Sequence, residues 1–138
     1  MMKVYVIDGQ GGRLGQLLVE EILREVQSCD LTVVGTNSIA TMAMMKAGAG
    51  KGATGENPVI LAARKADVII GPIGIIAADS LLGEITPAMA AAVGQSEAVK
   101  LLLPVSHCRN QVIGVRSMSM GEMVKEAVVQ LRNHMEKK

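Results

Sequence analysis

The sequence predicts an α/β domain spanning residues 1–138, with an open parallel sheet of four to six strands and helices on both faces. Three observations predict it. Apolar runs of three to five residues recur along the chain, and the stretches between them have the period of amphipathic helices. The runs are continuous rather than alternating, which is typical of parallel strands covered on both faces. A length of 138 residues fits one domain.

Four strands are expected at apolar runs bounded by glycine, proline or a charged residue. They cover residues 4–7, 31–34, 68–70 and 101–105. Residues 47–54 can hold a fifth strand that is too short and glycine-rich for its periodicity to show. Residues 111–115 are a candidate for a further strand at the edge of the sheet.

Five helices are expected between and after these strands. The first has an apolar face formed by Leu14, Leu17, Leu18, Ile22 and Val26, and the second covers residues 39–46. Asn57 before Pro58 and Thr86 before Pro87 each indicate an N-cap followed by proline at the first helical position. Ser119 with Glu122 three residues later is a capping box that opens the last helix.

Charge and composition exclude several classes of partner. The formal net charge is +1, so no global field draws the protein onto nucleic acid or anionic lipid. One tyrosine, with neither tryptophan nor phenylalanine, leaves no stacking platform for single-stranded nucleic acid. The most membrane-like stretch, residues 68–78, is well short of the roughly 20 residues that a span requires. We expect neither nucleic acid nor a membrane as partner.

Cysteine and histidine spacing predicts no metal site. Cys29, Cys108, His107 and His134 are scattered, without a zinc-binding pattern. The apolar stretch at the amino end is too brief for a signal peptide. An apolar chain can build its core without a disulfide, so reduced thiols in the cytoplasm are expected.

The most informative segment follows the first expected strand and opens the first expected helix. It reads Asp8-Gly9-Gln10-Gly11-Gly12-Arg13-Leu14-Gly15, in which every third residue from Gly9 is glycine. The first of these glycines permits a tight turn, the second lets the backbone approach a phosphate, and the third allows close helix–strand contact. Unpaired N–H groups at the start of the helix favour an anion such as a diphosphate. We expect a nucleotide or dinucleotide here; another anionic ligand and a purely structural turn are the alternatives.

This segment closely resembles the GxxGRMG opening of dihydrodipicolinate reductases, which depend on NAD(P). The resemblance covers residues 1–30. It implies that Gly9, Gly12, Arg13 and Gly15 face the phosphate side of the cofactor. Asp8 departs from the pattern, because a carboxylate beside a diphosphate repels it unless it is protonated or holds a cation. The reductases' substrate domain and catalytic residues have no counterpart in this chain, so no catalytic residue is nominated.

Further candidate ligand contacts lie at the carboxyl ends of the other strands, where open parallel sheets bind ligands. These residues are Thr36, Asn37, Ser38, Gly71, Pro72, Ile73 and Gly74, followed by the segment 104–108. The first three are hydrogen-bonding but uncharged, and they stand where a ribose-binding acidic residue is expected. Residues 66–74 are similar to the fourth-strand stretch of many Rossmann dehydrogenases, whose following loop borders the cofactor ribose. A buried strand ending in a turn explains the same glycines without a ligand.

Several polar groups have both a functional and a structural interpretation. Residues 48–57 form either a mobile lid that holds Lys51, Thr54 and Glu56 over the site or a connector. Asp79 and Glu84 either project toward the site or, as the preferred interpretation, are solvated charges around a turn. An acid/base or metal pair of Asp8 with Glu56, and a nucleophile and base at 107–108, are weaker alternatives.

Apolar content of 49% in a short chain also favours self-association. The expected helix at residues 39–46 carries Met42, Met44 and Met45 around much of its circumference, so it is the candidate surface. Methionines that fill irregular gaps in the core are the alternative.

Nearly the whole chain resembles a bacterial family of short Rossmann-like proteins described as a domain of unknown function. The matching segments are residues 7–12, 35–37, 46–49, 52–57, 71–75 and 82–87. The resemblance implies a nucleotide-binding-like α/β fold and brings no activity with it. Two hypotheses follow: a small oxidoreductase or cofactor-sensing module that binds NAD(P) or another nucleotide, and a non-catalytic homo-oligomeric structural or regulatory protein.

Overall fold

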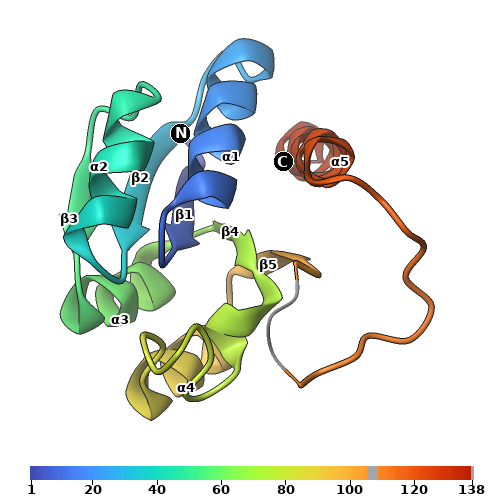
Figure 1. Cartoon of the computed structure of the whole chain (residues 1–138). Helices are drawn as coiled ribbons and strands as arrows, with labels where there is room; N and C mark the ends of the chain where they lie inside the picture. The colour runs from blue at the N-terminus through green and yellow to red at the C-terminus, as the bar shows by residue number, and fades with distance from the viewer. Residues whose placement is uncertain (106–108, 138) are drawn as a thin grey trace.

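Five parallel strands form one open sheet in the order β3-β2-β1-β4-β5 (Figure 1). The structure is a computed structural model that describes residues 1–105 and 109–137. Its strands are β1 (Lys3–Asp8), β2 (Asp30–Gly35), β3 (Gly52–Thr54), β4 (Val68–Pro72) and β5 (Val99–Leu103). This order, with helical connections, is that of Rossmann-like sheets and confirms the predicted fold class.

The described residues form five α-helices and one short 3₁₀ helix, of which α5 follows the last strand and the others lie between strands. They are α1 (Arg13–Glu25), α2 (Ser38–Lys46), α3 (Glu56–Lys65), η1 (Ile73–Ile76), α4 (Pro87–Gln95) and α5 (Met120–Glu136). The predicted caps of two helices are confirmed: Thr86 accepts from the Met89 amide at 3.1 Å, and Ser119 accepts from the Glu122 amide at 3.1 Å.

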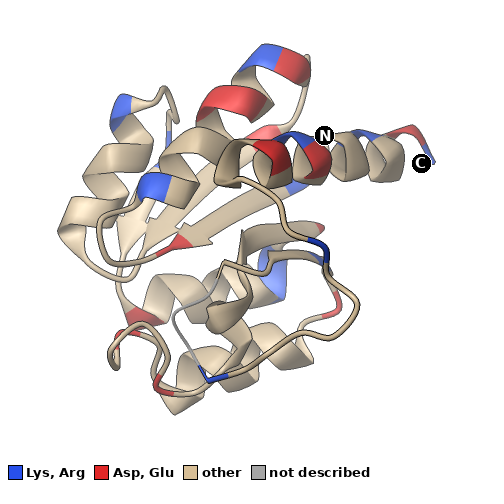
Figure 2. Ribbon diagram, turned by 45° about the vertical axis from the view of Figure 1, so that its right-hand side comes forward, with Lys and Arg blue, Asp and Glu red and all other residues tan. Residues whose placement is uncertain are grey.

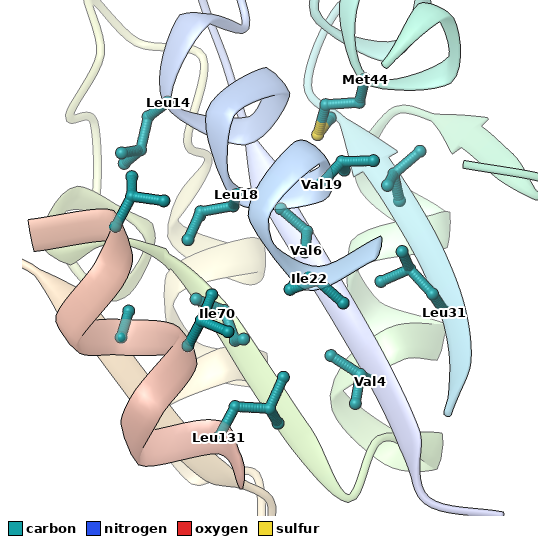
Figure 3. Close-up of a cluster of buried hydrophobic side chains, with 14 of the residues drawn as sticks. Val4, Val6, Leu14, Leu18, Val19, Ile22, Leu31, Met44, Ile70 and Leu131 are labelled. Atoms are coloured by element: carbon teal, nitrogen blue, oxygen red, sulfur yellow. The ribbon is translucent and has the colours of Figure 1, made fainter. Parts of the chain in front are cut away.

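Two apolar clusters hold the layers together, one on each face of the sheet. On one face, α1, α2 and α5 cover the strands, and Leu18, Ile22 and Leu131 pack over Val4 and Val6 (Figure 3). On the other face, α3 and α4 cover a cluster that includes Ile7, Ile69, Val59 and Met89. Both faces of the central strands are therefore buried, as the continuous apolar runs predicted.

The chain reverses direction across the sheet between β1 and β4. From β1 the chain continues outward to β2 and then β3 at one edge. Helix α3 then carries it back to β4, on the other side of β1, and β5 follows at the opposite edge. The carboxyl ends of the two central strands, Asp8 and Pro72, therefore lie beside the point where ligands bind in open α/β sheets.

Three expectations about the elements need correction. Helix α3 begins at Glu56 with Gly55 as its N-cap at φ +112°, so Asn57 is not a cap. Residues 111–115 form no strand. The last strand is Val99–Leu103 rather than 101–105, because it starts where its backbone first pairs with β4. The possible strand within 47–54 is present as β3, which pairs with β2 at the edge of the described sheet.

Among the described residues, no helix has both the length and the apolar character needed to cross a membrane. Lysine, arginine and acidic residues are interspersed along the ribbon, without an extended region of one sign in the view of Figure 2.

Candidate functional site

A tight turn at residues 9–12 connects β1 to α1. The Gly12 amide donates to the Gly9 carbonyl at 2.9 Å, and Gly12 takes a left-handed conformation at φ +75° as the N-cap of α1. Gln10 is also left-handed at φ +50°. The turn thus lies at the carboxyl edge of the sheet, between the end of β1 and the start of α1.

Asp8 binds the inside of this turn. Its two carboxylate oxygens accept from the Gly9 amide at 2.8 Å and from the Gly15 amide at 2.7 Å. The side chain is only 6% exposed. Burial raises the pKa of Asp8, the two amides lower it, and the nearby Glu84 charge raises it further, with a net increase. The Gly9 and Gly15 amides, which were expected to be open to a ligand, therefore donate to Asp8 instead.

The three spaced glycines have different neighbours. A Cβ at Gly9 would lie 2.6 Å from Thr36 Oγ1 and 2.9 Å from Glu84 Oε1, so this glycine faces the candidate site. A Cβ at Gly12 would lie 2.8 Å from the Ala40 Cα atom. Gly12 therefore makes room for α2, which corrects the expectation that its missing side chain admits a phosphate. Gly15 allows close contact with both Met44 and Asp8, in line with its expected packing role.

Glu84 crosses from the segment after β4 to the glycine turn and the end of β2. Its Oε1 atom accepts from the Gln10 amide at 2.8 Å, the Thr36 hydroxyl at 2.6 Å and the Asn37 side-chain amide at 2.9 Å. Burial acts to raise the pKa of Glu84, but the three donors together lower it below its ordinary value. The preferred interpretation of Glu84 as a solvated charge is wrong, and the alternative that it projects toward the site is confirmed.

The segment 77–86 that carries Glu84 has an unusual backbone. Asp79, Leu81 and Leu82 have φ of +66°, +55° and +56°, a conformation that costs roughly 1–2 kcal/mol per non-glycine residue. Hydrogen bonds hold it at several points: the Asp79 amide donates to the Ile85 carbonyl at 2.7 Å, and Thr86 Oγ1 donates to Glu56 Oε1 at 2.5 Å. The structure thus fixes a strained segment that delivers one carboxylate to the turn.

The residues at the end of β2 join the same cluster. The Thr36 amide donates to the Asp8 carbonyl at 3.0 Å. Asn37 caps α2 by accepting from the Ala40 amide at 2.9 Å, and its side-chain amide also donates to the Gln10 carbonyl at 3.0 Å. Ser38 begins α2 with an exposed side chain. Thr36 and Asn37 thus lie at the carboxyl edge of the sheet, where they were predicted.

The candidate residues after β4 lie beneath the strained segment. Gly71 packs directly against the Ile7 carbonyl, and Ser80 donates to the Gly74 carbonyl from segment 77–86. Pro72 ends β4 as a buried residue, while Ile73 and Gly74 begin η1. These glycines therefore serve close packing, which was the structural alternative for them.

The outer side of the glycine turn is open. The amides of Gly11, Arg13 and Leu14 donate to no other described residue. A Cβ on Gly11 would meet nothing within 4 Å, and the Arg13 side chain is exposed and forms no ion pair with the described chain. These amides and one guanidinium can receive an anion at the positive end of α1.

The lid interpretation of residues 48–57 is wrong. Lys51 pairs with Asp30 at the amino end of β2, far from the glycine turn along that strand. Thr54 Oγ1 lies 2.7 Å from Thr41 Oγ1, and Glu56 Oε1 accepts a hydrogen bond from Thr86 Oγ1. Within residues 1–105 and 109–137, no cluster of three or more histidine, cysteine or acidic side chains offers a metal site. The pair at residues 107–108 falls outside the described residues.

A hollow of about 490 Å³ lies away from the glycine turn, between β5, residues 114–116 and α5. The turn itself is partly covered, because Leu81 and Glu84 approach Gly9. The candidate site is consequently a polar edge of the sheet that these two side chains partly cover.

A family model described as "Domain of unknown function (DUF3842)" matches residues 3–136. The chain belongs to the DUF3842 family. Searches of curated proteins and of solved structures each found no match. The DUF3842 model covers both the glycine turn and the segment that carries Glu84, so the whole cluster lies within the family's own domain.

Proposed function

We propose that the chain binds a nucleotide or dinucleotide at the carboxyl edge of its sheet, with the phosphates at the start of α1 and the ribose near the end of β2. The observation that carries this proposal is the group of amides at Gly11, Arg13 and Leu14, which have no partner among residues 1–105 and 109–137, beside the exposed Arg13 guanidinium. A helix N-terminus of this kind, next to a glycine turn, stabilises phosphate charge.

Two further features support the proposal. The site lies where the strand order reverses, between β1 and β4. The turn also resembles the NAD(P)-binding opening of dihydrodipicolinate reductases. The repulsion that Asp8 exerts on a phosphate is reduced, because both of its oxygens accept from the Gly9 and Gly15 amides within the turn and its pKa is raised.

The proposal concerns binding, and a cofactor-sensing role agrees with the residues at the site. The described groups around the turn are two carboxylates, a hydroxyl, an amide side chain and a guanidinium, without a histidine or cysteine. A small oxidoreductase would take its redox chemistry from a bound nicotinamide cofactor and needs from the protein only its orientation.

Thermal unfolding with and without NAD, NADP and ATP tests this function. A ligand present at about one hundred times its dissociation constant stabilises the folded state by about 2.7 kcal/mol. The informative variant is Gly11→Val, because Gly11 faces open space and its backbone is not left-handed. We expect it to fold normally and lose the ligand response.

We propose self-association through α2 as a second property. Ile39, Met42 and Met45 are 68%, 57% and 37% exposed and lie along its outer side, whereas Met44 is fully buried. Three large apolar side chains at this helical spacing form a contiguous surface that suits a second copy of the chain.

A further inference from the structure

The end of β2 lacks the acidic residue that usually recognises a ribose in sheets of this type. Thr36, Asn37 and Ser38 stand there, and none carries a charge. The structure supplies a carboxylate at this place from elsewhere in the chain, because Glu84 is bound to Thr36 and Asn37 through its Oε1 atom. We infer that Glu84 is the ribose-recognising residue of the site, and that the ligand is a nucleotide with free ribose hydroxyls.

This inference rests on the proposed nucleotide function and specifies its ligand class. Oε1 of Glu84 is committed to three donors, whereas Oε2 accepts no hydrogen bond from the described residues. The side chain is only partly buried, and Oε2 is the oxygen that its internal hydrogen bonds leave for a ligand hydroxyl. A carboxylate held by three donors is already oriented, and a hydroxyl that donates to it loses little additional freedom.

Charge makes the site selective. None of the described groups that hold Glu84 is basic, since they are a main-chain amide, a hydroxyl and a carboxamide. A ribose hydroxyl donates to the carboxylate, but a phosphate on the same ribose oxygen places like charges together without a cation among the groups that hold Glu84. The site therefore accepts NAD or ATP and rejects NADP.

The competing interpretation is that Glu84 occupies the ligand's own place. The Gln10 amide that binds Oε1 belongs to the glycine turn, so a carboxylate there can stand in for a ligand phosphate. The two interpretations predict opposite effects of removing the charge. If Glu84 recognises ribose, the neutral variant binds more weakly; if it blocks the site, the variant binds more tightly.

Isothermal titration of the full chain with NAD and NADP distinguishes them. Wild type should bind NAD at least tenfold more tightly than NADP. Glu84→Gln should weaken NAD binding by about tenfold to a hundredfold, the range for a hydrogen bond to a charged group, and reduce the preference over NADP. Glu97→Gln is the control, because Glu97 is exposed just before β5, at the opposite edge of the sheet.

Each contrary result has a definite meaning. Equal affinity of wild type for NAD and NADP overturns the inference without any variant. Tighter binding of NAD by Glu84→Gln also overturns it and assigns Glu84 as an internal competitor, while the proposed function stands. If neither wild type nor the variant binds NAD, NADP or ATP, the proposed function fails and the inference fails with it.

Discussion

Glu84 Oε1 lies 2.6 Å from Thr36 Oγ1, although the two residues are 48 positions apart in the chain. This contact joins the segment after β4 to the end of β2 across the carboxyl edge of the sheet. The same oxygen contacts the Gln10 amide, which is 74 positions away. Three separate parts of the sequence thus converge on one atom.

Gly12→Val should destabilise the fold whether or not a ligand is present. Its Cβ would lie 2.8 Å from the Ala40 Cα atom, and its φ of +75° disfavours a β-branched side chain. We expect a loss of more than about 2 kcal/mol in the free energy of unfolding, measured by urea titration. Gly11→Val is the matched control with near-normal stability, and equal stability of the two variants would contradict the assigned packing role of Gly12.

Acid should release Glu84 from its three donors. Because the folded pKa of Glu84 is lowered, its stabilising contribution is present above the ordinary pKa and is lost as the pH falls through the folded value. The stability difference between wild type and Glu84→Gln should therefore shrink from pH 7 toward acidic pH. The raised pKa of Asp8 acts in the opposite direction, and because the Glu84 charge contributes to that increase, the difference between the two proteins, measured by urea titration, reports Glu84 together with its effect on Asp8. A difference that is constant with pH argues against an ionised, hydrogen-bonded Glu84.

Thr86→Val should remove a cap and a tether together. Thr86 accepts from the Met89 amide at 3.1 Å and donates to Glu56 at 2.5 Å. Loss of an N-cap typically costs about 1 kcal/mol, and the tether to α3 adds to that cost. Thr86→Ser keeps both hydrogen bonds and should restore most of the stability, as monitored by thermal unfolding. Similar melting temperatures for the two variants would show that the hydroxyl contributes nothing.

Met42→Lys should disrupt self-association through α2. Met42 is 57% exposed, so a lysine there is tolerated by the folded monomer but introduces like charges at a contact between two copies. Light scattering at high concentration should give a larger mass than 14.5 kDa for wild type and a reduced one for the variant. A wild-type protein that stays at 14.5 kDa refutes the proposed contact.

The regular elements of this fold could be predicted because their signals are local. Continuous apolar runs marked the central strands, and Thr86-Pro87 and Ser119 with Glu122 marked two helix starts. Gly55 was missed as a cap because glycine there provides only backbone geometry, whereas the neighbouring Asn57-Pro58 resembles a stronger signal.

Only part of the candidate site could be predicted, because only part of it has a local signal in the sequence. The glycine turn and the polar end of β2 follow from strand order, since parallel strands end at the same edge. Glu84 does not, because its place depends on three left-handed residues that are not glycine, and two of them are leucines, which no local rule favours there. The usable signal was its position in a carboxyl-edge loop, two residues before Thr86, the N-cap of α4.

Titration of NAD into wild type and Gly11→Val, with calorimetric detection, tests the nucleotide site most directly. We predict that wild type binds NAD and that Gly11→Val, with an unchanged melting temperature in the absence of ligand, does not. Equal binding by both proteins would show that NAD does not bind at the glycine turn. No binding of NAD, NADP or ATP by wild type would contradict the nucleotide function itself.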